Sequence, residues 1–143
     1  MIVLDTNVIS EVFRPRPDPI VVAWLQNLTG EVAITAITLA ELLAGVRGLP
    51  DGKRKAALAA TIDATVEPYR QTRALLPFDD SAAQAYADIL TERERAGLPI
   101  SMADAQIAAI CRSRNASCAT RDLKDFAKTG IDLVDPWANG PVA

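Results

Sequence analysis

The sequence predicts an α/β protein, in which helices cover both faces of a central, mostly parallel sheet. Short apolar runs of strand length alternate with longer segments of helical periodicity along the chain. The length of 143 residues fits one domain, and 50% of the residues are hydrophobic, enough for a sizeable core. We see no internal repeat, linker or low-complexity segment, so we expect a single domain over residues 1–143.

The N-terminal segment is predicted to form a strand, a turn and a helix. Residues 2–4 are a short apolar run, as in a buried strand, and residues 5–7 favour turns and helix caps. Apolar side chains then recur at helical spacing as far as Phe13. The proline-rich stretch 14–19 ends that helix and begins another.

The next segments repeat this alternation. The second helix is amphipathic over 20–28, residues 32–34 are a second apolar strand, and 35–46 form a helix that a glycine and a proline end. Residues 51–73 form a longer, alanine-rich helical region, in which we expect Pro68 to cause a break.

The last elements complete the sheet. They are an extended piece at 75–78, helices at 80–96 and 101–114, a strand at 118–120, a turn or short helix at 122–126, and a strand at 131–134. The helix over 80–96 is predicted to carry the run 92–95 on a charged, solvated face. Parallel sheets of this kind bind ligands beyond the carboxyl ends of their strands, which directs attention to the residues that follow each strand.

The composition excludes several kinds of chemistry. The chain has no histidine, which removes Ser-His-Asp and Cys-His catalysis and histidine-ligated zinc or haem. The net charge of -3 argues against a surface that is basic throughout, although a few arginines can still hold nucleic acid. Cys111 and Cys118 make no disulfide framework, and Cys111 has the pattern of a core residue. With no signal peptide or membrane span in the sequence, we expect a cytoplasmic protein.

Four carboxylates lie where the predicted strands end or the following helices begin. Asp5 and Asp122 follow strands, and Glu41 and Asp104 lie early in helices. Each acid is also compatible with a plain capping role, because Thr38-x-x-Glu41 and Ser101-x-x-Asp104 match a capping box.

The surroundings of these acids favour a site over caps when they are taken together. Glu41 and Asp104 share their helix faces with small or apolar residues and with no basic partner at helical spacing. Converging carboxylates require protons or a cation, and an all-oxygen site without histidine selects Mg²⁺ or Mn²⁺. Such an ion lowers the pKa of a bound water, which predicts hydrolysis of a phosphodiester.

The order of the motifs resembles the PIN-domain nucleases, and more closely the VapC-type toxins of toxin–antitoxin pairs, with a tail similar to the FitB-like subgroup. The resemblance covers Ile2 to Trp137. It is carried by Leu4–Val8, Thr38–Gly45, Ser101–Ala108, Ala119–Phe126 and Leu133–Trp137. It implies a PIN-like (Rossmann-like) α/β/α sandwich and an endoribonuclease that depends on Mg²⁺ or Mn²⁺.

The same resemblance implies roles for individual residues. Asp5, Glu41 and Asp104 match the three core acids of the family, and Asp122 matches the fourth acidic or amide position. Asp5 and Asp104 are expected to bind the metal directly, and Glu41 and Asp122 directly or through water. Residues expected to support the acids are Thr6, Asn7, Thr120 and Asp125, although Asp125 also fits a cap or surface charge.

Partners follow from the resemblance as well. It implies an RNA substrate, a homodimer, and an antitoxin protein that covers the acidic groove. Arginine side chains are the candidate phosphate contacts, Arg121 first because it precedes Asp122. The others are Arg14, Arg16, Arg112 and Arg114. Trp24 and Trp137 are expected to anchor the core or an interface.

Two other functions remain open at this point. A phosphatase with Asp5 as covalent nucleophile requires a second aspartate two residues on, where this chain has Asn7. A non-toxin, receiver-like module with an acidic Mg²⁺ pocket requires a phosphoacceptor aspartate after its third strand and a lysine near its last. Glu41 and the arginine-rich set fit that pattern poorly.

Overall fold

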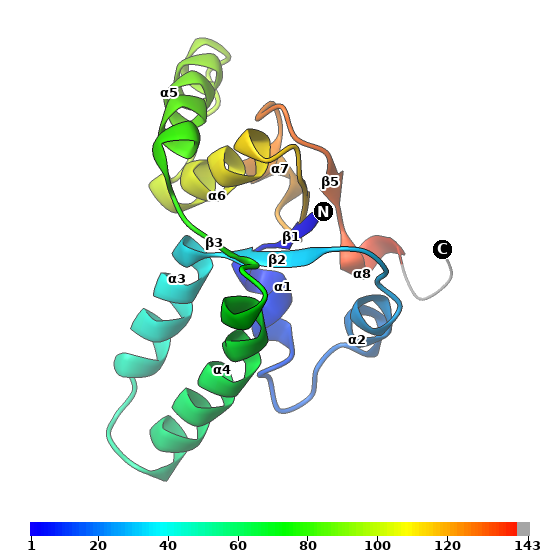
Figure 1. Ribbon diagram of the computed structural model, residues 1–143, viewed down its shortest axis with the longest axis vertical. Helices are drawn as coiled ribbons and strands as arrows, with labels where there is room; N and C mark the ends of the chain where they lie inside the picture. The colour runs from blue at the N-terminus through cyan, green and yellow to red at the C-terminus, as the bar shows by residue number, and fades with distance from the viewer. Residues whose placement is uncertain (140–143) are drawn as a thin grey trace.

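The centre of the fold is a five-stranded sheet, seen in a computed structural model that describes residues 1–139 (Figure 1). The remaining four residues of the predicted domain, 140–143, lie outside the described residues. The strand order is β3-β2-β1-β4-β5, and every pairing is parallel, which confirms the predicted sheet. The strands are β1 (Ile2–Leu4), β2 (Val32–Thr35), β3 (Leu75–Leu76), β4 (Ser117–Ala119) and β5 (Leu133–Val134).

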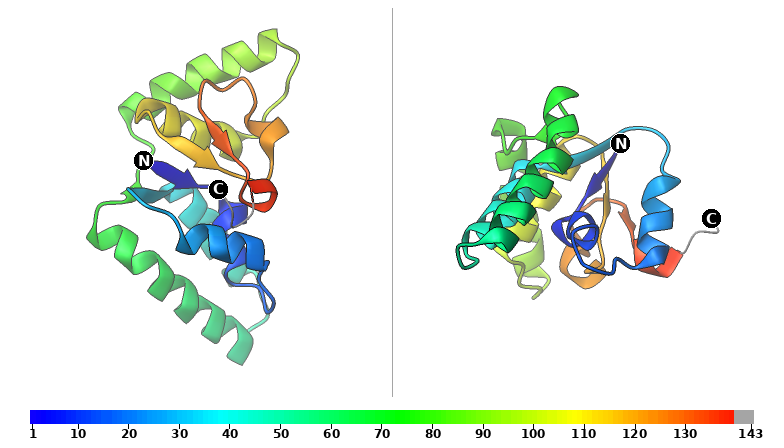
Figure 2. Two further views of the ribbon diagram at one scale, coloured as in Figure 1. Left: turned by 90° about the vertical axis from the view of Figure 1, so that its right-hand side faces the viewer. Right: turned by 90° about the horizontal axis from the view of Figure 1, so that it is seen from below.

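Helices form a layer on each face of this sheet (Figures 1 and 2). They are α1 (Thr6–Glu11), α2 (Pro19–Gln26), α3 (Ala36–Arg47), α4 (Lys53–Gln71), α5 (Asp80–Arg95), α6 (Met102–Ser113), α7 (Leu123–Phe126) and α8 (Pro136–Asn139). In Figure 1, α5 and α6 lie above the sheet and α1, α3 and α4 below it. No helix among residues 1–139 is long and apolar enough to cross a membrane.

Alternate residues of the central strands divide the core into two parts. Val3 and Cys118 pack with α5, α6 and α7, whereas Leu4 and Ala119 pack with the helices of the other layer. This is the period of two that a strand buried on both faces requires. Cys111 lies fully buried in the first part, as predicted, and both cysteines are free thiols.

The start of α3 differs from the predicted capping box. The N-cap is Thr35, the last residue of β2, and its hydroxyl accepts a hydrogen bond from the Thr38 amide at 3.1 Å. The strand therefore passes into the helix without a loop, and Thr38 lies inside the first turn instead of capping it. Ser101 does cap α6, as its motif predicts, by accepting from the Asp104 amide at 3.2 Å.

The predicted break at Pro68 is wrong, because α4 continues past it. Proline removes one helical donor, so the carbonyl of Ala64 loses its partner in the helix. Both residues are exposed, and water can bond that carbonyl. Buried Ile62 and Val66 hold this part of the helix against the core, and Thr72 closes it with two bonds to the Pro68 carbonyl.

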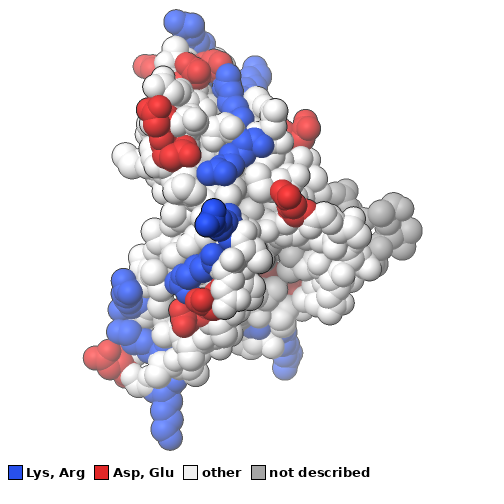
Figure 3. Space-filling view, viewed as in Figure 1, with Lys and Arg blue, Asp and Glu red and all other residues white. Residues whose placement is uncertain are grey.

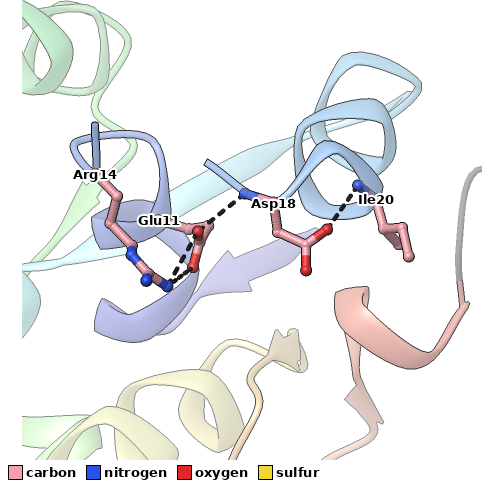
Figure 4. Close-up of polar contacts among 4 residues, drawn as sticks. All are labelled: Glu11, Arg14, Asp18 and Ile20. Atoms are coloured by element: carbon pink, nitrogen blue, oxygen red, sulfur yellow. Dashed lines mark hydrogen bonds and ion pairs between the residues drawn. The ribbon is translucent and has the colours of Figure 1, made fainter. Parts of the chain in front are cut away.

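Glu11 is a buried carboxylate that fixes the turn between α1 and α2 (Figure 4). It accepts hydrogen bonds from the Arg14 guanidinium at 3.2 Å and from the Asp18 amide at 3.0 Å. The Asp18 side chain in turn caps α2 through the Ile20 amide at 2.9 Å. The proline-rich stretch is therefore folded back onto the end of α1.

Arg93 is buried, with 3% of its surface exposed, which corrects its predicted place on a charged face. Its guanidinium donates to four backbone carbonyls, those of Leu98, Pro99, Lys124 and Ala127. This position of α5 faces the α5–α6 connection, which supplies the Leu98 and Pro99 carbonyls, and the end of α7, which supplies those of Lys124 and Ala127. Arg93 thus ties the α5–α6 connection to α7.

Replacing Arg93 by methionine is expected to lower the free energy of unfolding by about 2–4 kcal/mol, because several buried carbonyls lose their donor. Urea denaturation of the purified variants measures this change. Arg95→Met, on an exposed position of the same helix, is the matched control and is expected to change stability by less than about 0.5 kcal/mol. Equal losses in both variants contradict the tying role of Arg93.

Candidate active site

The acids singled out in the sequence lie beyond the carboxyl ends of the central strands. Asp5 follows β1 directly, Asp122 follows β4, Glu41 lies in α3 after β2, and Asp104 lies in the first turn of α6. Their charges act on one another: Asp104 and Glu41 both raise the pKa of Asp5. The parallel sheet therefore brings these side chains into one region, as the topology predicts.

Asp5 is the most buried of these acids, with 4% of its surface exposed. Burial raises the pKa of Asp5 to about 6, and the charges of Asp104 and Glu41 add to that effect. Two donors oppose it, the Thr120 hydroxyl and the Thr6 amide, each 2.8 Å from one carboxylate oxygen. Asp5 thus caps α1 and faces the other acids, so the capping role and the site role coincide in one side chain.

A second set of contacts joins the first turn of α1 to the segment after β4. The Asn7 amide donates to Asp122 at 3.0 Å, and its oxygen accepts from the Arg121 amide at 3.3 Å. The Thr120 hydroxyl, which donates to Asp5, also accepts from the Asp122 amide at 3.0 Å. Neutral amide and hydroxyl groups therefore set the distance between the first and the fourth acid.

Glu41 and Asp104 complete the set from the two helices. The Thr6 hydroxyl donates to Glu41 at 2.7 Å, and the same hydroxyl lies 3.0 Å from that of Thr38. Partial burial raises the pKa of Asp104. A hydrogen bond from Ser101 opposes the shift, and the charges of Asp125, Glu41 and Asp122 increase it. Asp125 is thus close enough to act on this group.

No arginine or lysine neutralises these acids. Within residues 1–139, none of Asp5, Glu41, Asp104, Asp122 and Asp125 forms an ion pair. On the face shown in Figure 3, basic side chains form an interrupted band with acidic side chains beside it, so charge is spread unevenly over this face.

Three of the candidate phosphate-binding arginines pair with carboxylates outside the acid set, and Arg16 forms no ion pair among the described residues. Arg14 pairs with Glu11, Arg112 with Glu92 and Arg114 with Asp79. The guanidinium of Arg121 instead lies over the Trp137 ring, 4.9 Å from its centre. The ring itself packs on the core beside α2, and Trp24 packs on the same part of the core, as expected for core anchors.

The donor set fits a hard divalent cation. It offers carboxylate oxygens that pair with no basic side chain among residues 1–139. Burial raises the pKa of both Asp5 and Asp104, and the charges of neighbouring acids add to each shift. Within the described part of the chain, no three metal-ligating side chains are grouped closely enough to hold an ion as they stand. The acids therefore surround a common region but do not converge on one point, because their negative charges repel one another.

Two features of this region were not predicted from the sequence. Thr38 was assigned to a cap, yet its buried hydroxyl faces Thr6 and, through it, Glu41. Its spacing of one helical turn from Glu41 was the available signal. The stacking of Arg121 on Trp137 had no local signal, since 16 positions separate the two residues in the chain.

Comparisons with known proteins agree on one family. The family model described as the PIN domain matches residues 2–132. The VapC ribonuclease Y4jK of Sinorhizobium fredii is 39% identical over 138 residues, which cover 96% of this chain and 98% of that protein. Toxin FitB of Neisseria gonorrhoeae is 42% identical over 138 residues, covering 96% of this chain and 99% of the relative.

Solved structures show the same likeness in three dimensions. The crystal structure of FitAcB from Neisseria gonorrhoeae matches with a TM-score of 0.89 at 40% identity, covering 96% of this chain and 99% of that one. A member of the VapBC family of toxin-antitoxin systems, VapBC-5 from Mycobacterium tuberculosis, matches with a TM-score of 0.69 at 27% identity, covering 92% and 95%. The arrangement of strands and helices is therefore shared over nearly the whole chain.

Asp5→Asn is expected to stabilise the cation-free protein in EDTA above pH 6, because the variant removes a buried charge. The pKa of Asp5 is about 6 in the folded state against an ordinary 3.8. Between about pH 4 and pH 6, the Asp5 carboxyl group therefore keeps its proton in the folded state and loses it in the unfolded state. The free energy of unfolding of the wild type consequently falls as the pH rises over this range. Denaturant melts at pH 4 and pH 7 are expected to show a difference between variant and wild type that grows by about 1–3 kcal/mol.

The matched control for this comparison is Asp88→Asn, on an exposed position of α5 without an ion pair in the described structure. Its difference from wild type is expected to stay constant between the two pH values. If the difference in unfolding free energy between Asp5→Asn and the wild type is also the same at both pH values, Asp5 does not carry a destabilising buried charge.

Proposed function

The chain belongs to the PIN-domain family, and from this premise we propose that it is the ribonuclease toxin of a toxin–antitoxin pair, an endonuclease that requires Mg²⁺ or Mn²⁺. The observation that carries the proposal is the set of mutually repelling acids without basic partners at the carboxyl edge of the sheet. Family membership favours this function over a phosphatase or a non-catalytic Mg²⁺ module. Asn7, engaged with Asp122, also leaves no second aspartate for a phosphatase.

Each acid has a part in this proposal. Asp5 and Asp104 hold the cation directly, and Glu41 and Asp122 hold it directly or through water. When bound, a divalent ion polarises a phosphodiester and lowers the pKa of water enough for it to act as the nucleophile. This supplies the general-base chemistry that a chain without histidine otherwise lacks.

The neutral residues around the acids hold the carboxyl groups in place. Thr6 and Thr120 donate to Glu41 and Asp5, and Asn7 donates to Asp122. These donors orient each carboxylate without adding a positive charge beside it. Asp125, at the start of α7, adds negative charge near Asp104.

The partners of this chain follow from its relatives. FitB is named a toxin, and the VapBC-5 structure is that of a toxin–antitoxin family. We therefore assign this chain an antitoxin protein as its inhibitor and RNA as its substrate, in the cytoplasm and as a homodimer. An antitoxin arginine is suited to the acid set, because a guanidinium can take the place of the cation.

Arg121 is the proposed RNA contact. Its guanidinium lies over the Trp137 ring and forms no ion pair within residues 1–139, and its backbone amide is bonded to Asn7 beside the acids. A positive group at this edge offsets the repulsion between a polyanionic substrate and the carboxylates.

The central test is metal-dependent cleavage of RNA by the purified protein. Cleavage is expected with Mg²⁺ or Mn²⁺ and to be abolished by EDTA. Asp5→Ala or Asp104→Ala is expected to lower the rate at least about 100-fold, because each removes a proposed direct ligand. Expression of the wild type, and not of these variants, is expected to arrest growth.

Asp88→Ala is the control for this test, since it removes an exposed acid of α5. It is expected to cleave RNA and to arrest growth like the wild type. Cleavage that continues in EDTA, or in both Asp5→Ala and Asp104→Ala, contradicts the proposed function.

Arg121→Lys is expected to raise the KM for RNA about 5-fold to 10-fold with little change in kcat, because lysine keeps the charge but loses the planar fork and the stacking. Trp137→Leu is expected to shift KM in the same direction, and steady-state kinetics on one RNA measure both. Arg54→Lys, exposed at the start of α4, is the control. An unchanged KM in Arg121→Lys contradicts this contact.

A further inference from the structure

We propose that Thr38, supported by Thr35, is a positioning residue for Glu41, acting through the Thr6 hydroxyl. The inference rests on the proposed function, because it assigns the three hydroxyls to the placement of one acid of the cation site. The groups form a continuous series: Thr35 lies 3.4 Å from Thr38, Thr38 lies 3.0 Å from Thr6, and Thr6 lies 2.7 Å from Glu41, all measured between oxygens.

The direction of donation along this series is fixed. The Thr6 hydroxyl has a single proton, which it donates to the Glu41 carboxylate, since an ionised carboxylate only accepts. In its contact with Thr38, Thr6 is therefore the acceptor, and Thr38 donates. Thr35 donates in turn to Thr38 and accepts from the Thr38 amide. All the donors point toward Glu41, an arrangement in which each bond strengthens the next.

Burial gives the series a rigid base. Thr35 and Thr38 are fully buried, whereas Glu41 is exposed to solvent. Thr6 is the hydrogen-bonding partner of the Glu41 side chain among the described residues. An exposed glutamate samples many rotamers in the absence of such contacts, and a buried donor series behind it restricts that freedom before any cation binds.

The behaviour of other threonines shows that this arrangement is not the default for a helix. Thr61, Thr65 and Thr91 each donate to the carbonyl four residues earlier in their own helix, as helical threonines often do. Thr38 instead crosses from α3 to the Thr6 side chain on α1. Its hydroxyl therefore joins α3, which carries Glu41, to α1, which Asp5 caps, instead of bonding within its own helix.

The test compares Thr38→Val, which keeps the shape but removes the hydroxyl, with Thr38→Ser, which restores it. The matched control is Thr129→Val: Thr129 is also fully buried, but its hydroxyl donates to the Phe126 carbonyl. Two readouts are used, the ¹³C resonance of the Glu41 carboxyl group in cation-free protein and the affinity for Mn²⁺ alone by calorimetry.

Thr38→Val is expected to shift the Glu41 resonance and to weaken Mn²⁺ binding about 10-fold, since removal of supporting contacts typically costs this much. Thr38→Ser is expected to recover both values, and Thr129→Val to leave both unchanged. Thr6→Val breaks the same series at a less buried position and tests it independently. In the Thr6→Val/Thr38→Val double variant, no further loss is expected.

An unchanged Glu41 resonance in both Thr38→Val and Thr6→Val, or an equal change in Thr129→Val, overturns the inference. Failure of the proposed function has a different signature. A wild type that cuts no RNA with Mn²⁺, while Thr38→Val still shifts the Glu41 resonance, overturns the ribonuclease assignment and supports the positioning of Glu41.

Discussion

The burial of the Asp5 carboxylate at the end of the central strand is the constraint on which the rest of the site depends. Burying an ionised carboxylate at the end of β1 costs free energy, and the raised pKa of Asp5 reflects that cost. The Thr120 hydroxyl and the Thr6 amide offset it in part, and each belongs to a segment that also contacts another acid. The loops after β1 and β4 are thus held in position around a single carboxylate.

The donors around the acids are neutral, which has a functional consequence. Hydroxyls and one amide orient Asp5, Glu41 and Asp122, and the described structure pairs none of them with a base. Such donors fix geometry without cancelling charge, so the negative charge that we propose a cation neutralises is retained. The guanidinium of Arg121 lies over the Trp137 ring and pairs with none of the acids in the described structure, which suits the phosphate contact that we propose for it.

Two buried charged groups outside the site are compensated by hydrogen bonds. Arg93 donates to four carbonyls, and Glu11 accepts from a guanidinium and a backbone amide, so each of these two buried charges has several hydrogen-bond partners. They fix turns between helices. Asp5, by contrast, lies among other acids without a basic partner in the described structure. Proteins keep such a free-energy cost mainly at sites where the charge serves function.

The sequence by itself determined the sheet, the helices and the edge at which the acids gather, because strand and helix periodicity are local and parallel strands end on one side. The PIN-type order of motifs was also visible along the chain. Tertiary structure alone decided that α4 passes through Pro68, that Arg93 is buried, and that Thr38 faces Thr6 instead of capping α3. Each of these outcomes depends on which distant surface a helix meets, and no local pattern encodes that contact.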